Sequence, residues 1–76
     1  MPLAFVMINA ELGMEKQLIQ DLKSIDGVKE ASEVYGIYDI VVKIEAESMD
    51  RLKEAVSRRI RSLKGVRSTL TMVVIE

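Results

Sequence analysis

The chain has 76 residues, no cysteine and no histidine, and its 11 basic and 12 acidic residues give a formal net charge of -1. A chain of this length forms one domain and buries only about 60% of the surface that its unfolded form exposes, so we expect oligomerisation to add stability. The balanced charge gives no general attraction to phosphate backbones, and the lack of histidine and cysteine excludes catalytic triads, thiol nucleophiles and imidazole- or thiolate-bound metals.

The first segment, residues 3–9, is apolar at every position but the last. Leu3, Phe5 and Met7 alternate with Ala4, Val6 and Ile8, which predicts a strand with two apolar faces in the middle of a sheet. This run is too short to span a bilayer and no basic segment precedes it, so we expect a cytoplasmic protein without a membrane segment.

Residues 14–25 have the spacing of a surface helix, with apolar residues on one side and charged residues on the other, and Gly27 is the expected stop signal. Residues 28–35 carry charges on both faces, which favours an edge strand. We expect Gly36 to form a tight turn into a second central strand, residues 40–45.

Ser48 is a good N-cap for a second helix, and Asp50 in its first turn suits the positive end of the helix dipole. The helix is predicted to end at Lys64-Gly65, and residues 68–75 form the last strand. An internal repeat supports this division, because residues 22–29 match residues 60–67 in residue type at seven of eight positions. Two βαβ halves predict an α+β, ferredoxin-like β-α-β-β-α-β fold, with strand order 4-1-3-2 and both helices on one face.

Two helices cover one face of this sheet, yet the first, third and fourth strands offer apolar side chains to both faces. About six apolar side chains on the open face would contribute on the order of 10 kcal/mol if buried, at roughly 1.5 to 3 kcal/mol each. Soluble monomers seldom expose so large an apolar patch. The sequence therefore predicts a dimer in which two sheets pack face to face.

One short segment groups two aromatic residues, a glycine and a carboxylate: Tyr35, Gly36, Ile37, Tyr38 and Asp39. Backbone N–H groups near Gly36 can hold a carboxylate, and Asp39 can hold an ammonium, which are the two charged ends of a free amino acid. The alternative is a plain hairpin turn in which Asp39 bonds its own backbone and the tyrosines cover the edge of the dimer. The residues alone weigh these alternatives about evenly.

Basic residues of the second helix and beyond raise the alternative of nucleic-acid binding: Arg51, Lys53, Arg58, Arg59, Arg61, Lys64 and Arg67. Ferredoxin-like RNA binders read bases with aromatic residues on the central strands, where this chain offers only Phe5. We therefore expect no direct nucleic-acid contact. The carboxylates stand among lysines and arginines as surface charges, so we expect no catalytic site, no metal and no cofactor.

The run Gly36-Ile37-Tyr38-Asp39-Ile40-Val41-Val42-Lys43, followed by Leu63-Lys64-Gly65-Val66 and Ser68-Thr69-Leu70-Thr71, resembles the RAM (regulation of amino acid metabolism) domain of the Lrp/AsnC family of transcriptional regulators. The resemblance runs the length of the chain, residues 1–76. Full-length members carry an N-terminal helix-turn-helix that binds DNA, and this sequence is similar to the regulatory part without it. It thus looks like a stand-alone RAM domain.

The resemblance implies a sheet-face homodimer, dimers assembled into rings of eight or ten subunits, and an amino acid bound in the cleft between dimers. It implies a ligand loop of Tyr35, Gly36, Ile37, Tyr38 and Asp39, with Ser68, Thr69, Leu70 and Thr71 as neighbouring contacts. Our leading hypothesis is a non-enzymatic amino-acid-binding module in transcriptional regulation. The alternatives are an assembly partner of full-length relatives without its own ligand and, less favoured, a small ferredoxin-like monooxygenase.

Overall fold

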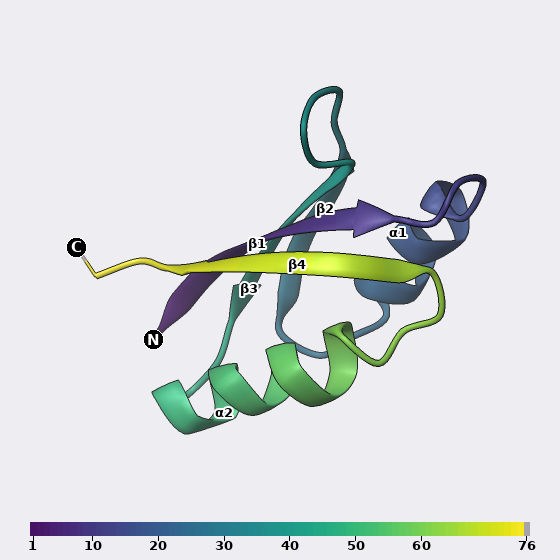
Figure 1. The fold of residues 1–76 in the computed structure, drawn as a ribbon. Coiled ribbons are helices and arrows are strands. Elements are labelled where there is room, and N and C mark those ends of the chain that lie inside the picture. Colours follow the sequence, from purple (N-terminus) through teal and green to yellow (C-terminus); the bar gives the residue numbers. More distant parts are fainter. Residues whose placement is uncertain (76) are drawn as a thin grey trace.

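The computed structural model describes residues 1–75. It contains a four-stranded antiparallel sheet in the order β2-β3-β1-β4, which is the predicted order 4-1-3-2 read from the other edge. The elements in chain order are β1 (Leu3–Ala10), α1 (Glu15–Lys23), β2 (Val28–Glu33), β3 (Ile40–Glu45), α2 (Met49–Glu54), the π-helical segment η1 (Ala55–Ile60) and β4 (Val66–Val73). Figure 1 shows the helices on one side of the sheet. The ferredoxin-like prediction is confirmed.

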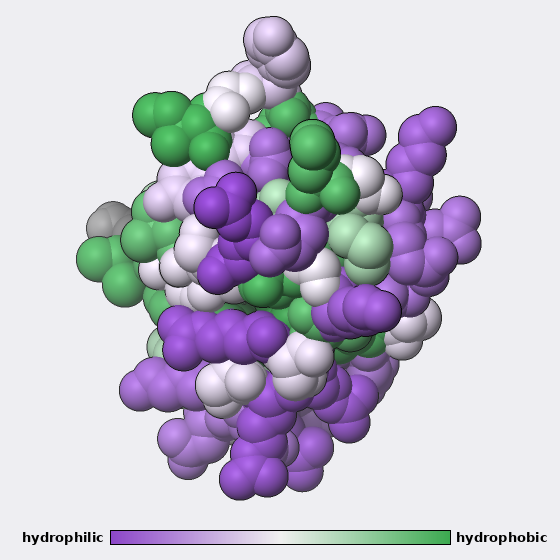
Figure 2. Space-filling model, turned by 45° about the vertical axis from the view of Figure 1, so that its right-hand side comes forward, coloured by the Kyte–Doolittle hydropathy of each residue, from purple (hydrophilic) through white to green (hydrophobic). Residues whose placement is uncertain are grey.

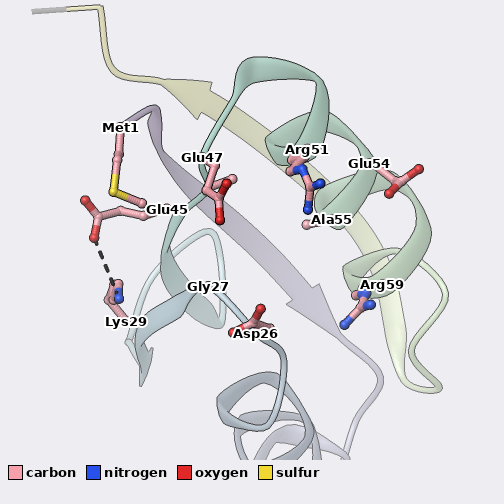
Figure 3. A pocket seen from close by; sticks show the side chains of 11 residues that line it. Met1, Asp26, Gly27, Lys29, Glu45, Glu47, Arg51, Glu54, Ala55 and Arg59 are labelled. Atoms are coloured by element: carbon pink, nitrogen blue, oxygen red, sulfur yellow. Dashed lines mark ion pairs between the residues drawn. The ribbon is translucent and has the colours of Figure 1, made fainter.

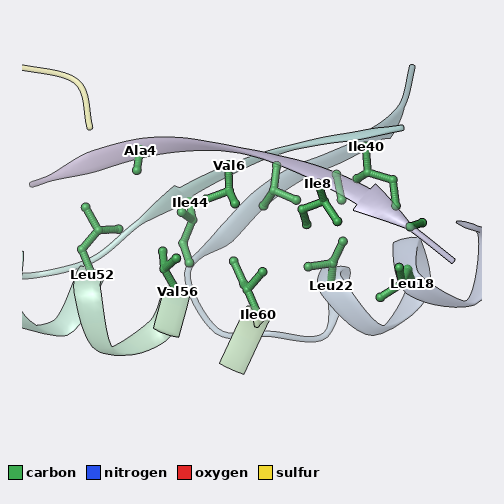
Figure 4. Packing of buried hydrophobic residues seen from close by; sticks show 13 residues of the cluster. Ala4, Val6, Ile8, Leu18, Leu22, Ile40, Ile44, Leu52, Val56 and Ile60 are labelled. Carbon is green, nitrogen blue, oxygen red and sulfur yellow. The ribbon is translucent and has the colours of Figure 1, made fainter. Parts of the chain in front are cut away.

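The core lies between the sheet and the helices, because alternate residues of the central strands point to that side. The buried side chains of β1 and β3 meet those of the helices in a single apolar cluster (Figure 4). Its largest fully buried members are Ile8, Leu18, Leu22, Ile40, Ile44, Leu52, Ile60, Val6 and Val42. The alternation predicted for the first strand is therefore confirmed.

Several boundaries differ from the prediction. The first helix is shorter than residues 14–25, and the last strand begins and ends two residues earlier than residues 68–75. Ser48 caps the second helix as predicted, since its Oγ accepts a hydrogen bond from the Arg51 N–H at 3.2 Å. From Ala55 the helix widens, and Arg61 N–H bonds to Val56 O at 3.1 Å, five residues back. The spacing of the apolar residues did not predict this π-helical turn.

No helix within residues 1–75 is long and apolar enough to cross a membrane.

The prediction of a tight hairpin turn at Gly36 was wrong. Strand β2 ends at Glu33, paired with Ile40, so six residues separate the two strands. The Val34 N–H bonds to Asp39 O at 2.8 Å and closes a loop with Tyr35–Tyr38 at its tip. This loop projects from the end of the sheet (Figure 1). Tyr35 cannot be a strand residue here, because it lies beyond the last cross-strand pair.

The sheet face away from the helices is partly apolar. Register places Met7 opposite Leu70 and Phe5 opposite Met72, and cross-strand partners share a face. The apolar residues of this face are Leu3, Phe5, Met7, Val41, Leu70 and Met72, six side chains in all. Strand β3 supplies fewer of them than predicted, because Lys43 and Glu45 follow Val41 on this face. Figure 2 shows hydrophilic side chains over the lower part of the molecule, where α2 lies in Figure 1, and several apolar side chains higher up.

Two glycines with a positive φ provide a matched test of the packing at the α1–β2 turn. A Cβ added at Gly27 (φ +96°) would lie 2.5 Å from Glu45 O, whereas one added at Gly13 (φ +86°) would meet no atom within 4 Å. We expect Gly13→Ala to cost about 1–2 kcal/mol from backbone strain alone. Gly27→Ala should cost about twice as much or more, because the backbones must also separate. Urea unfolding of both variants measures the difference, and equal losses would contradict the close packing of Gly27 on β3.

Candidate functional site

The loop predicted to bind a ligand has an exposed tip and an anchored base. Tyr35 and Ile37 have relative exposures of 108% and 89%, whereas Tyr38 and Asp39 are half-buried. The tip therefore places two large side chains in solvent without any contact that would stabilise the folded single chain. Such side chains are available to a second molecule.

Asp39 forms the base of the loop through three hydrogen bonds. Its N–H donates to Ile8 O at 2.9 Å, its backbone O accepts from Val34 N–H at 2.8 Å, and its Oδ2 accepts from Ala10 N–H at 2.8 Å. The carboxylate therefore binds the backbone at the end of β1, rather than the loop's own backbone. Its other oxygen, Oδ1, has no hydrogen bond from residues 1–75. A carboxylate accepts several hydrogen bonds, so this oxygen can still receive one from an ammonium.

The four predicted contacts on the last strand divide between the two faces of the sheet, because side chains alternate along a strand. Ser68 and Leu70 lie on the open face, where Ser68 Oγ accepts from Asn9 Nδ2 at 3.0 Å and Leu70 is 45% exposed. Thr69 and Thr71 lie on the helix side. The Arg61 Nε–H donates to Thr69 Oγ1 at 3.2 Å, and Thr71 Oγ1 is buried without a partner within the described residues.

The loop and the start of β4 nevertheless meet at one end of the sheet. Ile8 pairs with Ile40 on one side and with Thr69 on the other, so β1 is the single strand between them. Two strand spacings amount to about 10 Å, which a small ligand and its surrounding side chains can bridge. The structure thus brings Asp39 and Ser68 to the same end of the sheet, on either side of β1, although 29 residues separate them in the sequence.

Neither of the two cavities described in residues 1–75 includes a predicted site residue. One, of about 300 Å³, lies between α2 and the start of β2, where Arg51 and Arg59 project from the helical segment and Lys29 pairs with Glu45 at 4.0 Å (Figure 3). The other, of about 530 Å³, lies between α1 and the edge strand β2. The predicted loop is thus an open surface in the single chain.

Residues that the sequence analysis did not assign to the site also lie at this end. Asn9 bonds Ser68 across β1 and β4, and Ala10 supplies the N–H that holds Asp39. Leu12, in the loop after β1, is 96% exposed. An asparagine at the end of an apolar strand was the one available sequence signal. Across the described part of the chain, no three carboxylates come together as a metal site.

Comparison with known proteins identifies the family. The model of the Lrp/AsnC ligand binding domain matches residues 3–76. The chain belongs to this family. Its structure is similar to that of FFRP-DM1, with a TM-score of 0.95 and 33% identity, covering 99% of this chain and 100% of that chain. It is also similar to PHS023 from Pyrococcus horikoshii, with a TM-score of 0.94 and 33% identity, covering 100% of this chain and 92% of that chain. The chain also matches the Escherichia coli AsnC structure with a TM-score of 0.91 and 26% identity, covering 99% of this chain and 51% of that chain. The predicted family is therefore confirmed, and these structural neighbours support a regulatory domain.

The curated relatives include an enzyme. Homocitrate synthase of Saccharolobus islandicus is 47% identical to this Lrp/AsnC chain over 55 residues, which are 72% of the chain and 12% of the enzyme. The chain thus corresponds to a small part of that relative. A segment similar to most of this chain therefore occurs within a protein named as an enzyme.

Proposed function

We propose that this chain is a non-enzymatic, cytoplasmic module that binds a free amino acid and takes part in transcriptional regulation. One observation carries the proposal: Asp39 is held at the end of β1 with one carboxylate oxygen occupied and the other free. Family membership adds support, since the part of the Lrp/AsnC family that matches this chain is its ligand binding domain. A structural relative with 16% identity, NMB0573 from Neisseria meningitidis, is described in complex with L-Met.

The ligand would lie against the loop, between two dimers. Backbone N–H groups around Gly36 would receive its carboxylate, and Asp39 Oδ1 its ammonium. Tyr35, Ile37 and Tyr38 would enclose its side chain together with Ser68 and Leu70 on the open face. Thr69 and Thr71 point to the helix side, so we assign them contacts through the strand backbone.

The open sheet face would form the dimer. Its six apolar side chains, buried against a second copy, would contribute on the order of 10 kcal/mol, which is comparable with the entropic cost of association, about 4 to 15 kcal/mol. Dimers would then assemble into octamers or decamers through the end of the sheet. Leu12, Tyr35 and Ile37 support this second contact because each is almost fully exposed there.

Calorimetric titration with each common amino acid tests the ligand site. We expect binding of at least one amino acid, and Asp39→Asn should weaken it about tenfold or more, because the charge is lost while an oxygen remains to accept the Ala10 N–H. Asp39→Ala should abolish binding and also lower the free energy of unfolding by about 1–3 kcal/mol.

Asp26→Asn is the matched control, because Asp26 is exposed and lines the cavity beside α2. Binding should be unchanged in this variant. If no amino acid binds to the wild-type chain, the ligand proposal is wrong. If Asp39→Asn binds as tightly as wild type, Asp39 only positions the loop and a different group holds the ammonium.

The sheet dimer is tested with Met72→Glu, which places a charge on the open face where Met72 is 46% exposed. Burying that charge is unfavourable, so we expect at least about tenfold weaker dimerisation, measured by light scattering across a micromolar dilution series. Gln20→Glu adds the same charge on exposed α1 and should leave the mass unchanged. A wild-type chain that is monomeric under these conditions would contradict the dimer.

The homocitrate synthase match favours a second candidate function, in which the module regulates an enzyme instead of a promoter. Mixing the chain with a full-length Lrp/AsnC regulator and, separately, with homocitrate synthase distinguishes the two. A ligand-dependent complex with the regulator, detected by light scattering, is expected from the leading proposal. A ligand-dependent complex with the enzyme would support the second candidate, and a ligand-independent complex with the regulator would indicate an assembly role alone.

A further inference from the structure

Basic and acidic side chains are distributed unevenly along the chain. Residues 1–54 carry six basic and eleven acidic side chains, whereas residues 55–75 carry five basic and none acidic. A net charge of -1 therefore conceals a strongly positive segment. Four of its five cations recur at every third residue: Arg58, Arg61, Lys64 and Arg67. We call these four residues the cationic row.

The cationic row is exposed and held on a defined backbone. All four residues are exposed, and they run from η1 across the turn at Gly65 into β4. The Glu11 N–H bonds to Gly65 O at 2.7 Å, which fixes this turn against the segment after β1. Arg61 is oriented by its hydrogen bond to Thr69 Oγ1. Part of the entropic cost of arranging these charges is thus already met by the fold.

Intramolecular contacts do not account for the row. Basic residues in the last turn of a helix stabilise the helix dipole, which explains Arg58 and Arg61 but not Lys64 and Arg67, since these follow the helix. None of the four forms an ion pair with residues 1–75. Glu11 lies next to the turn, where its backbone N–H bonds to Gly65 O, but its carboxylate forms no ion pair within residues 1–75.

The internal repeat provides a comparison within the same fold. The positions equivalent to the cationic row are Gln20, Lys23, Asp26 and Lys29, at an offset of 38 residues. Only two of these are basic, and Lys29 pairs with Glu45. Two segments that occupy the same place in the fold therefore differ in charge, so the fold itself does not require the row.

We propose that the cationic row docks an acidic segment of a partner protein. The row is local, and the acidic remainder of the chain would repel a long polyanion that extends beyond it, which favours a short acidic segment over a nucleic acid. Three of the four cations are arginines, whose planar guanidinium groups form paired hydrogen bonds with carboxylates. The row also borders Ser68, so a docked partner would lie beside the end of the sheet that carries the loop.

The test uses fluorescence anisotropy with a labelled hexaglutamate peptide as the short acidic probe and a mixed-sequence DNA duplex as the alternative. We expect the wild-type chain to bind the hexaglutamate peptide, less tightly as salt increases. Arg61→Glu/Arg67→Glu should weaken this binding about tenfold, and Lys23→Glu/Lys29→Glu, which changes the net charge equally at the equivalent positions, by no more than about twofold. Arg58→Glu/Lys64→Glu repeats the test without removing the hydrogen bond to Thr69.

Each other outcome overturns the proposal. Equal losses in the two matched variants would show that the probe senses only net charge, and no binding to the hexaglutamate peptide would show that the row is merely solvated. Tighter binding to the DNA duplex with the same dependence on the row would assign it to nucleic acid. A fall in the mass of the chain's own oligomer on Arg61→Glu/Arg67→Glu would assign it to contacts between copies. The amino-acid titration is independent of all four results.

Discussion

The structure depends on the double-sided apolar character of β1. Its even-numbered residues are buried against the helices, and this side supplies the cooperative core of a very small domain. Its odd-numbered residues Leu3, Phe5 and Met7 are apolar as well, but no element of the described chain covers them fully. A central strand with two apolar faces needs two layers of cover, and two short helices provide one. The proposed dimer follows from this imbalance.

The same strand organises the candidate site. Strand β1 lies between β3 and β4, and both of these strands run antiparallel to it. The end of β1 therefore lies between the start of β3 and the start of β4. Asp39 attaches the long loop to this end through Ala10, and Asn9 attaches β4 through Ser68. The first contact anchors the loop and the second fixes the start of β4, so both lie at the same end of the sheet. Neither of the two cavities described in residues 1–75 includes these residues.

The two βαβ halves have the same fold but different surfaces. Residues 1–38 carry six acidic and three basic side chains, whereas residues 39–75 carry five acidic and eight basic ones and include the cationic row. Surface charge contributes little to the stability of a fold, so the two halves can differ in charge while their apolar positions have the same spacing. The difference therefore bears on partners rather than on folding. The fold presents an apolar sheet face, an exposed loop and the cationic row, and each of these surfaces suits a different kind of contact.

The sequence alone determined the order of the elements along the chain and the N-cap at Ser48, because these depend on local periodicity and on the chemistry of single residues. The strand order followed from the internal repeat, since two βαβ halves predict the ferredoxin-like topology, and charges on both faces predicted the edge position of β2. It also located the loop from Tyr35 to Asp39. Only the tertiary structure decided the length of that loop, since β2 ends where cross-strand pairing with β3 ends, and the pairing is a property of two strands together. The role of Asp39 was equally hidden, because its partner Ala10 lies 29 residues away. The structure also decided which contacts of the last strand lie on which face: Ser68 and Leu70 lie on the open face, and Thr69 and Thr71 lie on the helix side. This depends on which face the helices cover, and that is a property of the packed layers rather than of any one segment.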